Sequence, residues 1–397
     1  MNTNHSMSAL NHLRIIDLTR VRAGPTCCRI FADFGADVIQ VEATAGADPN
    51  STVLGSRLAA DSQNLHRNKR SITLNLKSPR GLKALMDLVK TADVVVENFR
   101  PDVKERLGFS YDKLAKVNPR IILASISGFG QTGPYAKRAG FDQIAQGMGG
   151  LMSVTGELGG GPMRAGIAVA DSSAGNYAAI GILVALAERE RSGKGQWVQT
   201  SLLQAMIAMT DFQAASYLVE GRVPRSVGND HPYSTPMGVL ATFDGHINIG
   251  VGGEGQWAGF CRAIERLDLQ DHPNFSVQEL RFQHRTELMA ELAVIFRRRT
   301  SEEWIKILTA ENVPAGSINN MDQVFKDPQV EHLAIAAPLQ HTDLGPIRLV
   351  ATPLTLSRTS PSVRTQAPAM GEHTTTILRE IGITEAEISS MRKAQEI

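Results

Sequence analysis

The sequence predicts an α/β fold, in which a large α/β domain with parallel strands precedes a smaller α+β domain. Residues 13–18 and 37–42 have the β-branched, apolar character of strands, and a helical stretch over residues 26–34 separates them. This alternation is typical of a parallel sheet. A change of composition at residues 221–225 indicates a linker before the second domain. The strands that continue the alternation are expected over residues 71–76, 93–97, 120–127 and 196–200.

The remaining elements follow from capping residues and apolar periodicity. Pro79 opens a helix in which Leu82, Leu85 and Leu88 share one face. Ser201 is expected to cap a long helix that ends at Val219. Later elements are a hairpin over 238–251, helices over 257–266, 284–298 and 301–311, strands over 347–350 and 354–356, and helices over 374–381 and 385–394. The predicted domains are residues 1–220 (large), 221–325 (small) and a C-terminal segment over 326–397.

Charge and cysteine content exclude several classes of protein. The chain has 41 Lys and Arg against 40 Asp and Glu, so no overall basic field predicts a nucleic-acid partner. Three cysteines without a C-x-x-C pair predict neither disulfides nor a metal site, and they favour the reducing cytoplasm. The first residues do not resemble a signal peptide. The most apolar run, residues 172–187, is short for a bilayer, so we expect a core helix and no membrane partner.

The chain is organised around Asp171, which follows a run of small and apolar residues and precedes an apolar helix. A helix start stabilises an anion through its free N–H groups and the helix dipole. The simplest interpretation is that Asp171 caps this helix. The alternative is a reactive carboxylate, because the small residues around it would leave room for a bulky substrate.

Residues 128–133 match G-x-G-x-x-G after a predicted strand. The match would suggest a dinucleotide-binding oxidoreductase. Pro134 follows instead of a helix, however, and no acidic residue stands at a strand end about 20 residues on. We therefore reject this interpretation.

Eight stretches together resemble the class III CoA-transferases, a family that also includes the α-methylacyl-CoA racemases. They are residues 18–25 (LTRVRAGP), 35–39 (GADVI), 68–72 (NKRSI), 96–99 (VENF), 128–134 (GFGQTGP), 168–171 (AVAD), 191–196 (RSGKGQ) and 371–374 (GEHT). They run nearly end to end. The pattern is most similar to the dicarboxylate branch, such as succinyl-CoA:glutarate transferase.

The resemblance implies a Rossmann-like large domain, a small domain and a C-terminal segment that returns to the large domain. It also implies a homodimer of two interlocked, ring-like chains. Asp171 falls on the family's nucleophile. It would form an anhydride with the acyl group of a donor acyl-CoA and then an aspartyl-CoA thioester. The implied substrates are succinyl-CoA and a free dicarboxylate, with no tightly bound cofactor.

Two sets of residues are expected to bind CoA. By resemblance, Arg22, Ala23, Leu74, Lys77, Asn98, Phe99 and Arg106 line its site. The phosphate groups need charge-assisted donors, for which Lys77, Arg106 and Lys137 or Arg138 are candidates. Each of these cations could instead be an ordinary solvated surface charge.

Substrate recognition is expected at a few further residues. Arg22 could hold the far carboxylate of a dicarboxylic acyl group, with Arg164 and His231 as weaker candidates. The racemases carry a Gly-His-Asp motif where this chain has Gly140, Phe141 and Asp142, which we expect beside the substrate. Phe141 cannot exchange protons, so two-base racemisation lacks a partner. A racemase and a non-catalytic acyl-CoA-binding module remain the alternatives.

Overall fold

A computed structural model describes residues 8–45 and 56–397 of the chain. The chain divides into two compact units. The first comprises Met1–Leu151, Arg164–Arg222 and Glu331–Ile397, and the second Met152–Met163 and Val223–Val330. The polypeptide thus leaves the first unit and returns to it twice.

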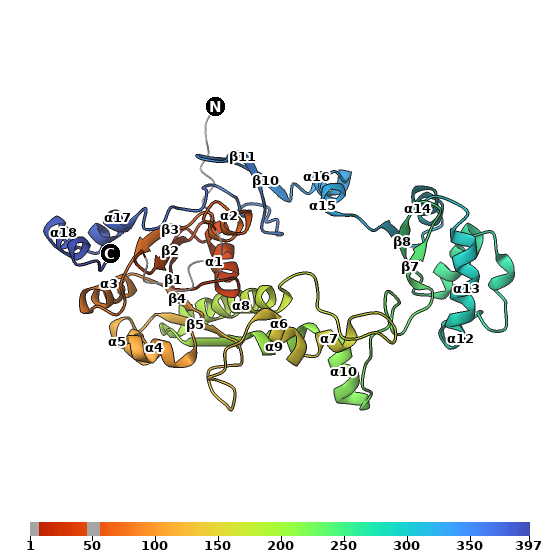
Figure 1. Ribbon diagram of the computed structural model, residues 1–397, viewed down its shortest axis with the longest axis horizontal. Helices are drawn as coiled ribbons and strands as arrows, with labels where there is room; N and C mark the ends of the chain where they lie inside the picture. The colour runs from red at the N-terminus through yellow and green to blue at the C-terminus, as the bar shows by residue number, and fades with distance from the viewer. Residues whose placement is uncertain (1–7, 46–55) are drawn as a thin grey trace. The chain divides into compact units, whose positions relative to one another are not determined.

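The first unit contains a six-stranded parallel sheet (Figure 1). Its strands are β1 (Arg14–Asp17), β2 (Asp37–Glu42), β3 (Arg70–Thr73), β4 (Val94–Glu97), β5 (Ile122–Ser127) and β6 (Trp197–Ser201). The order in space is β3-β2-β1-β4-β5-β6. All six strands lie within or beside the ranges that the sequence predicts. From the adjacent β1 and β4, the chain winds outward in opposite directions.

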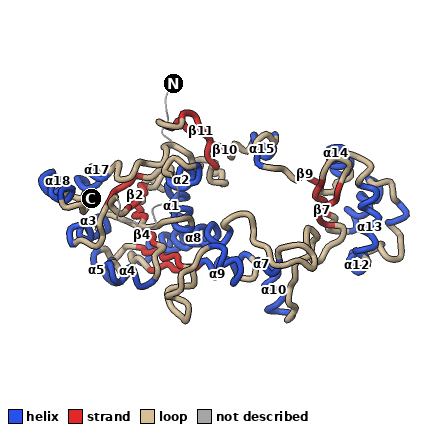
Figure 2. Tube along the Cα trace, in the orientation of Figure 1, coloured by secondary structure: helices blue, strands red, loops and turns tan. Residues whose placement is uncertain are grey.

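Helices cover both faces of this sheet, as apolar strands without alternation require. On one face, Ile15 packs with α1 (Ala23–Asp33) and α8 (Val169–Ser192). On the other, Ile16 packs with α3 (Pro79–Val89) and α5 (Tyr111–Val117). Ser78 caps α3 by accepting the Gly81 N–H. Pro79 stands at the first helical position, as the sequence predicts. Figure 2 shows the strands between these helices.

Helix α8 is longer than the apolar run suggested. It spans 24 residues and is long and apolar enough to cross a bilayer, although half of its most apolar window is buried. It packs closely on α1: a Cβ added at Gly175 would lie 2.4 Å from the Ala23 carbonyl oxygen. The small residues after Asp171 therefore serve helix packing as well as space at the site.

The rest of the first unit consists of further helices and of two strands in its C-terminal part. Its remaining elements are α2 (Ala60–His66), α4 (Pro101–Leu107), α6 (Asp142–Met148), α9 (Leu202–Met209), α10 (Asp211–Glu220), β10 (Ala336–His341), β11 (Gly345–Val350), α17 (Thr374–Glu380) and α18 (Glu385–Lys393). The predicted helix 201–219 is broken between α9 and α10, where Asp211 has a φ of 42°. Ser201 nevertheless caps α9 as expected. The predicted strand at 354–356 is irregular, and β10 was not expected.

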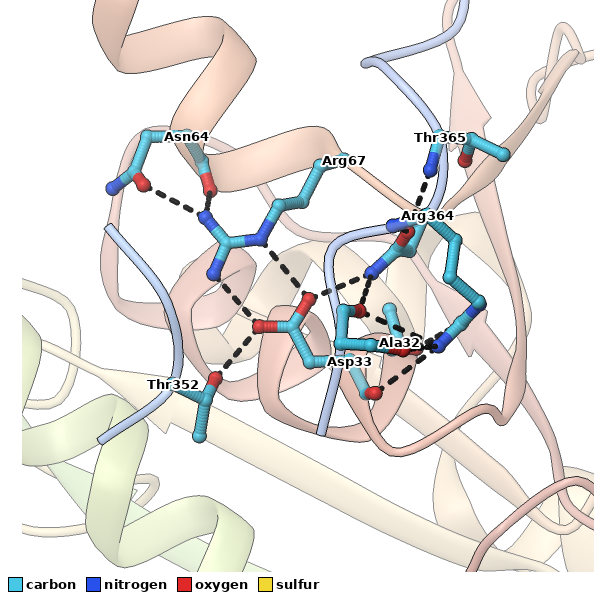
Figure 3. Close-up of polar contacts among 9 residues, drawn as sticks. Ala32, Asp33, Asn64, Arg67, Thr352, Arg364 and Thr365 are labelled. Carbon is cyan, nitrogen blue, oxygen red and sulfur yellow. Dashed lines mark hydrogen bonds and ion pairs between the residues drawn. The ribbon is translucent and has the colours of Figure 1, made fainter. Parts of the chain in front are cut away.

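The C-terminal segment is bound to α1 by a buried polar cluster around Asp33 (Figure 3). Arg67 donates to both carboxylate oxygens of Asp33 at 3.0 and 2.7 Å. Thr352 Oγ1 donates to the same carboxylate at 2.6 Å, and Arg364 donates to the carbonyl oxygens of Asp33 and Ala32. The Asp33 carboxylate and the backbone beside it thus join α1 to Thr352 and Arg364, more than 300 positions later.

The second unit has a three-stranded antiparallel sheet in the order β7-β8-β9. Its elements are β7 (Met237–Ala241), β8 (His246–Gly250), α11 (Glu254–Ala263), η2 (Leu267–Leu269), α12 (Gln278–Gln283), α13 (Arg285–Phe296), α14 (Ser301–Ala310), β9 (Ala315–Ser317) and α15 (Met321–Val324). The short helices α7 (Leu151–Val154) and α16 (Pro328–His332) lie at its boundaries. The predicted hairpin and three helices are confirmed. Trp257, Phe260 and Phe296 stack in its core.

Candidate active site

A pocket of about 160 Å³ opens at the carboxyl ends of β1, β4 and β5, within the first unit. Ligands of open α/β sheets bind at this edge, where neighbouring strands are followed by connections in opposite directions. The lining residues that follow β1 and β4 in the chain are Val21, Arg22, Ala23, Asn98, Phe99, Arg100 and Pro101. The remaining lining residues are Ile126, Ser127, Gly128, Ala136, Arg138, Gly140, Phe141, Asp171 and Leu202.

The pocket brings together about half of the residues that the sequence analysis singled out. They are Asp171, Arg22, Ala23, Asn98, Phe99, Arg138 and Phe141. Sequence reasoning missed Arg100, Ser127 and Leu202. The ends of predicted strands were the available signal, because Ser127 ends the predicted strand 120–127, and Arg100 and Leu202 come shortly after those at 93–97 and 196–200.

Asp171 is the third residue of α8, so it does not cap the helix. The N-cap position belongs to Ala168, whose side chain cannot accept a hydrogen bond. Burial and the neighbouring Asp142 carboxylate raise the pKa of Asp171 to about 6, while the Arg22 guanidinium acts in the opposite direction. In the described part of the chain, no side chain donates a hydrogen bond to the Asp171 carboxylate.

Asp142 lies behind the pocket, at the start of α6, and its side chain is buried. Its Oδ1 accepts the backbone N–H groups of Ala170 (2.8 Å) and Asp171 (3.3 Å). It thereby satisfies two donors that the first turn of α8 leaves without helical partners. Its Oδ2 accepts Gln146 Nε2 at 2.6 Å.

Arg22 lines the pocket and is also paired with an aspartate of α2. Its Nη2 lies 2.8 Å from Asp61 Oδ2, and both side chains are partly exposed. A guanidinium has five donors, so this pair leaves hydrogen-bonding capacity toward the pocket. Arg22 was expected to hold a substrate carboxylate, and this geometry accommodates that contact beside the ion pair with Asp61.

Asn98 and Phe99 form the turn after β4. The Asn98 side chain donates to the Arg20 carbonyl (2.7 Å) and accepts the Arg20 N–H (2.9 Å), so it ties this turn to the segment after β1. The backbone N–H of Phe99 donates to buried Glu97 at 2.9 Å. These contacts fix two walls of the pocket relative to each other.

The loop over residues 128–140 forms the opposite wall. A Cβ added at Gly128 would lie 2.9 Å from the Cα of Gly140, so the first glycine of the motif permits close backbone approach. No helix begins at Gly133 in this described stretch, so the motif lacks the helix that a dinucleotide fingerprint requires. The Cζ atom of Arg138 lies 3.7 Å from the centroid of the Tyr135 ring, and this contact orients a cation at the pocket.

The other singled-out residues do not line this pocket. Leu74 is buried beside β3, whereas Lys77, Arg106 and Lys137 are exposed. Arg164 is exposed and donates to the Ala165 carbonyl. His231 belongs to the second unit, where its Nδ1 accepts the Tyr233 N–H at 3.2 Å. Their proposed binding roles stay predictions.

The chemistry available in the pocket is that of a carboxylate. A carboxylate with a raised pKa and little hydration is a stronger nucleophile than one in water. Among the described residues that line the pocket, there is no histidine or cysteine. No group of three or more His, Cys, Asp or Glu side chains in the described ranges could hold a metal ion.

Comparisons with known proteins give a family assignment over nearly the whole chain. The model of CoA-transferase family III matches residues 10–374. A succinate–glutarate CoA-transferase of Agrobacterium fabrum is 38% identical, over 94% of this chain and 95% of its own. The human succinyl-CoA:glutarate CoA-transferase is 34% identical, over 95% of this chain and 87% of its own.

Solved structures agree with this assignment. The crystal structure of a CAIB/BAIF family protein from Brucella suis superposes with a TM-score of 0.81 at 34% identity, covering 94% of this chain and 99% of that one. The mixed α/β fold with its parallel sheet is therefore shared with solved relatives. From the pocket, the motifs and these matches together, the chain belongs to CoA-transferase family III.

Proposed function

We propose that this protein transfers CoA from succinyl-CoA to a free dicarboxylate, with Asp171 as the covalent nucleophile. The family assignment supports CoA transfer, and the names of the Agrobacterium and human relatives support this substrate pair. The observation that carries the role of Asp171 is its geometry: a carboxylate in a helix's first turn, raised in pKa and facing a pocket.

The proposed reaction proceeds by exchange at acyl carbons. The ionised Asp171 attacks the thioester carbonyl of succinyl-CoA, and CoA thiolate leaves, which gives an aspartyl–succinyl anhydride. The thiolate then attacks the aspartyl carbonyl, which releases succinate and forms an aspartyl-CoA thioester. The acceptor carboxylate attacks this thioester and expels the thiolate again. Finally, the thiolate attacks the acceptor's carbonyl in the second anhydride, which restores Asp171. No proton is transferred overall.

Racemisation of an α-methylacyl-CoA is the alternative within the same family. It requires a second proton-transfer group beside the substrate. Phe141 stands where the resemblance would place a histidine, it lines the pocket, and its side chain is largely exposed. This residue favours transfer over racemisation.

The pocket also suggests how the substrates bind. We propose that the first unit is a Rossmann-like domain for CoA, which the strand order supports. Arg138 would bind a phosphate group, and Arg22 would bind the far carboxylate of the dicarboxylic acyl group. Arg22 suits this role because it lies close enough to Asp171 to affect its pKa.

We further propose that the protein is a cytoplasmic homodimer whose chains interlock. Helix α8 leaves apolar side chains exposed on the first unit, including Ile180 (56%) and Val184 (64%). A second copy of the chain would remove this surface from water. The three buried thiols, Cys27, Cys28 and Cys261, are unpaired, which fits a reducing compartment. Light scattering in solution, with vesicle flotation as the comparison, would distinguish a dimer from a membrane-bound protein.

Mass spectrometry of CoA exchange tests the proposed function. The purified protein is incubated with succinyl-CoA and a set of mono- and dicarboxylic acids, and new acyl-CoA masses are measured. We expect glutaryl-CoA or a similar product, lost in Asp171→Asn and retained in Asp112→Asn, a matched change at an exposed aspartate. Binding of succinyl-CoA without exchange would instead indicate an acyl-CoA-binding protein. Solvent deuterium entering the α-carbon of a 2-methylacyl-CoA without exchange would indicate a racemase.

A further inference from the structure

We propose that Asp142, assisted by Gln146, is a positioning residue that holds the Asp171 turn and places a second negative charge beside the Asp171 carboxylate. This inference rests on the proposed role of Asp171 as nucleophile. Sequence reasoning expected Asp142 beside the substrate. The structure assigns it contacts with the backbone that carries the nucleophile.

The first observation is that the cap of α8 comes from another helix. Ser, Thr, Asp or Asn normally caps a helix from the N-cap position itself. Here that position holds Ala168, and the carboxylate of Asp142, 28 residues before Ala170, accepts the Ala170 N–H at 2.8 Å. The same oxygen accepts the Asp171 N–H at 3.3 Å. The orientation of the nucleophile's own backbone therefore depends on α6.

The second observation is the position of Gln146, one turn after Asp142 in α6. Its side-chain amide donates to Asp142 Oδ2 (2.6 Å) and to the Ile167 carbonyl (3.1 Å). Its Oε1 accepts the Ala165 N–H at 2.9 Å. Gln146 is fully buried. The two side chains of α6 thus contact the residues that lead into α8 at four backbone groups.

The third observation concerns charge. Asp142 is a second carboxylate next to Asp171, and its negative charge disfavours ionisation of Asp171. The charged groups that act on Asp171 are Asp142 and, in the opposite sense, Arg22 from the start of α1. A neutral acceptor at position 142 would cap α8 equally well. The negative charge therefore has a separate consequence, which is a more basic and more nucleophilic Asp171.

Two substitutions separate the cap from the charge. Asp142→Asn keeps an oxygen that can accept both N–H groups but removes the charge and the acceptor for the Gln146 amide. Gln146→Ala removes that amide contact without removing the charge. Asp142→Ala removes the accepting oxygen and the charge. The pH dependence of kcat/KM is measured for each variant and for the wild type, because its acid limb reports the ionisation of the free enzyme. Glu190→Gln, an exposed change near the far end of α8, is the matched control.

For Asp142→Asn we expect the acid limb to move down by about one pH unit. The plateau rate should fall about threefold, since nucleophilicity follows basicity. Asp142→Ala should show the same shift and a further loss of about tenfold or more in kcat, because the nucleophile is no longer oriented. Gln146→Ala should lower kcat without shifting the limb. An unchanged acid limb in Asp142→Asn would overturn the role of the charge, and equal rates for the Asp142→Asn and Asp142→Ala variants would overturn the role of the cap.

A measurement without substrate separates this inference from the proposed function. The melting temperatures of the wild type and Asp171→Asn are compared at pH 8, with and without Asp142→Asn. If Asp142 makes ionised Asp171 unfavourable, Asp171→Asn should raise the melting temperature more in the chain that retains Asp142 than in the chain that carries Asp142→Asn. Equal increments would contradict the inference, whatever reaction the protein catalyses. If these increments differ and no CoA exchange occurs, only the proposed function fails.

Discussion

Asp17 and Asp171 are two carboxylates of the same unit, and their pKa values are shifted in opposite directions. Asp17 ends β1 and is fully buried. Burial by itself would raise its pKa, but Lys69, with Nζ 2.8 Å from Oδ2, and Thr19 outweigh burial and hold the pKa below its ordinary value. Asp171 is less deeply buried, yet its pKa is raised to about 6.

The difference between the two lies in their neighbours. Asp17 has a cation and hydrogen-bond donors, whereas Asp171 has a second carboxylate next to it and only an opposing influence from Arg22. A compensated buried charge costs the fold little and is chemically inert. A poorly compensated charge costs stability and remains reactive, which is the arrangement found at many active sites. The contrast therefore supports the proposed role of Asp171 as the reactive carboxylate of the pair.

The largest effect is expected from removing the cation beside Asp17. Lys69→Met leaves a buried carboxylate without its partner, which should lower the free energy of unfolding by about 3 to 5 kcal/mol. Amide hydrogen exchange in β1 and α1 measures this loss locally. Replacing both partners, as in Asp17→Leu with Lys69→Met, should restore much of it, because no buried charge remains. A loss as large in the double variant would show that packing, and not charge, stabilises this site.

The next effect concerns activity. If ionised Asp171 is the nucleophile, kcat/KM for succinyl-CoA should be constant above a pH of about 6 and fall about tenfold per pH unit below it. Stopped assays with a matched dicarboxylate between pH 4.5 and 8 measure this limb. Asp112→Asn should leave it unchanged. A limb near pH 4 would mean that Asp171 is as solvated as an ordinary aspartate.

Stability should depend on Asp171 in the opposite sense from Asp17. The pKa of Asp171 is about 6 in the folded chain against an ordinary value of 3.8, so ionisation penalises the folded state. This penalty is fully present above about pH 6 and absent below about pH 4. Asp171→Asn should therefore raise the free energy of unfolding by about 1 to 3 kcal/mol at pH 8. The gain should shrink on acidification, as followed by thermal unfolding; a loss of stability at pH 8 would contradict the contrast.

Local patterns in the sequence predict most of the sheet and the position of Asp171, because strand periodicity and small residues act over a few neighbours. They place β1 to β6 within or beside the expected ranges, but they begin α8 a few residues late, with Asp171 as its cap. They do not predict that Asp142 caps α8, since this requires knowing that α6 and α8 meet. Ala168 at the N-cap carries the only local hint: its side chain cannot satisfy the N–H groups of the next turn.

Long-range pairing limits the remaining predictions in the same way. The Asp33 cluster joins α1 to Thr352 and Arg364, and nothing near Asp33 in sequence indicates these partners. The pairing of Arg22 with Asp61 is equally invisible from the sequence. Exposed Lys77 and Arg106 were expected to bind CoA by resemblance and by residue type, and residue type cannot tell a binding cation from a solvated one.

Arg22 provides a smaller test of the contrast, because it is the cation that partly offsets the charge at Asp171. Arg22→Leu should reduce the preference for glutarate over pentanoate, an acid of equal chain length, by about tenfold, since a bidentate partner for the far carboxylate is lost. Asp61→Asn should increase the same preference modestly, because it frees the guanidinium. The ratio of kcat/KM values for the two acids measures both effects. An unchanged ratio in Arg22→Leu would assign Arg22 to the ion pair alone.

The smallest effect is expected at a carboxylate that is paired as closely as Asp17 but on the surface. Asp87 accepts hydrogen bonds from Lys83 and Lys90 at 2.6 Å, and both lysine side chains are exposed, at 73% and 60%. The Asp87 side chain is itself only 12% exposed, but water solvates both lysine charges almost as well as Asp87 does, so Asp87→Asn should change the free energy of unfolding by less than about 1 kcal/mol. The change should shrink further at high salt, as urea unfolding at two ionic strengths would measure. An effect comparable to that of Lys69→Met would contradict the contrast. It would mean that the donor–acceptor distance, and not the burial of an unpaired charge, determines how much a carboxylate changes the free energy of unfolding.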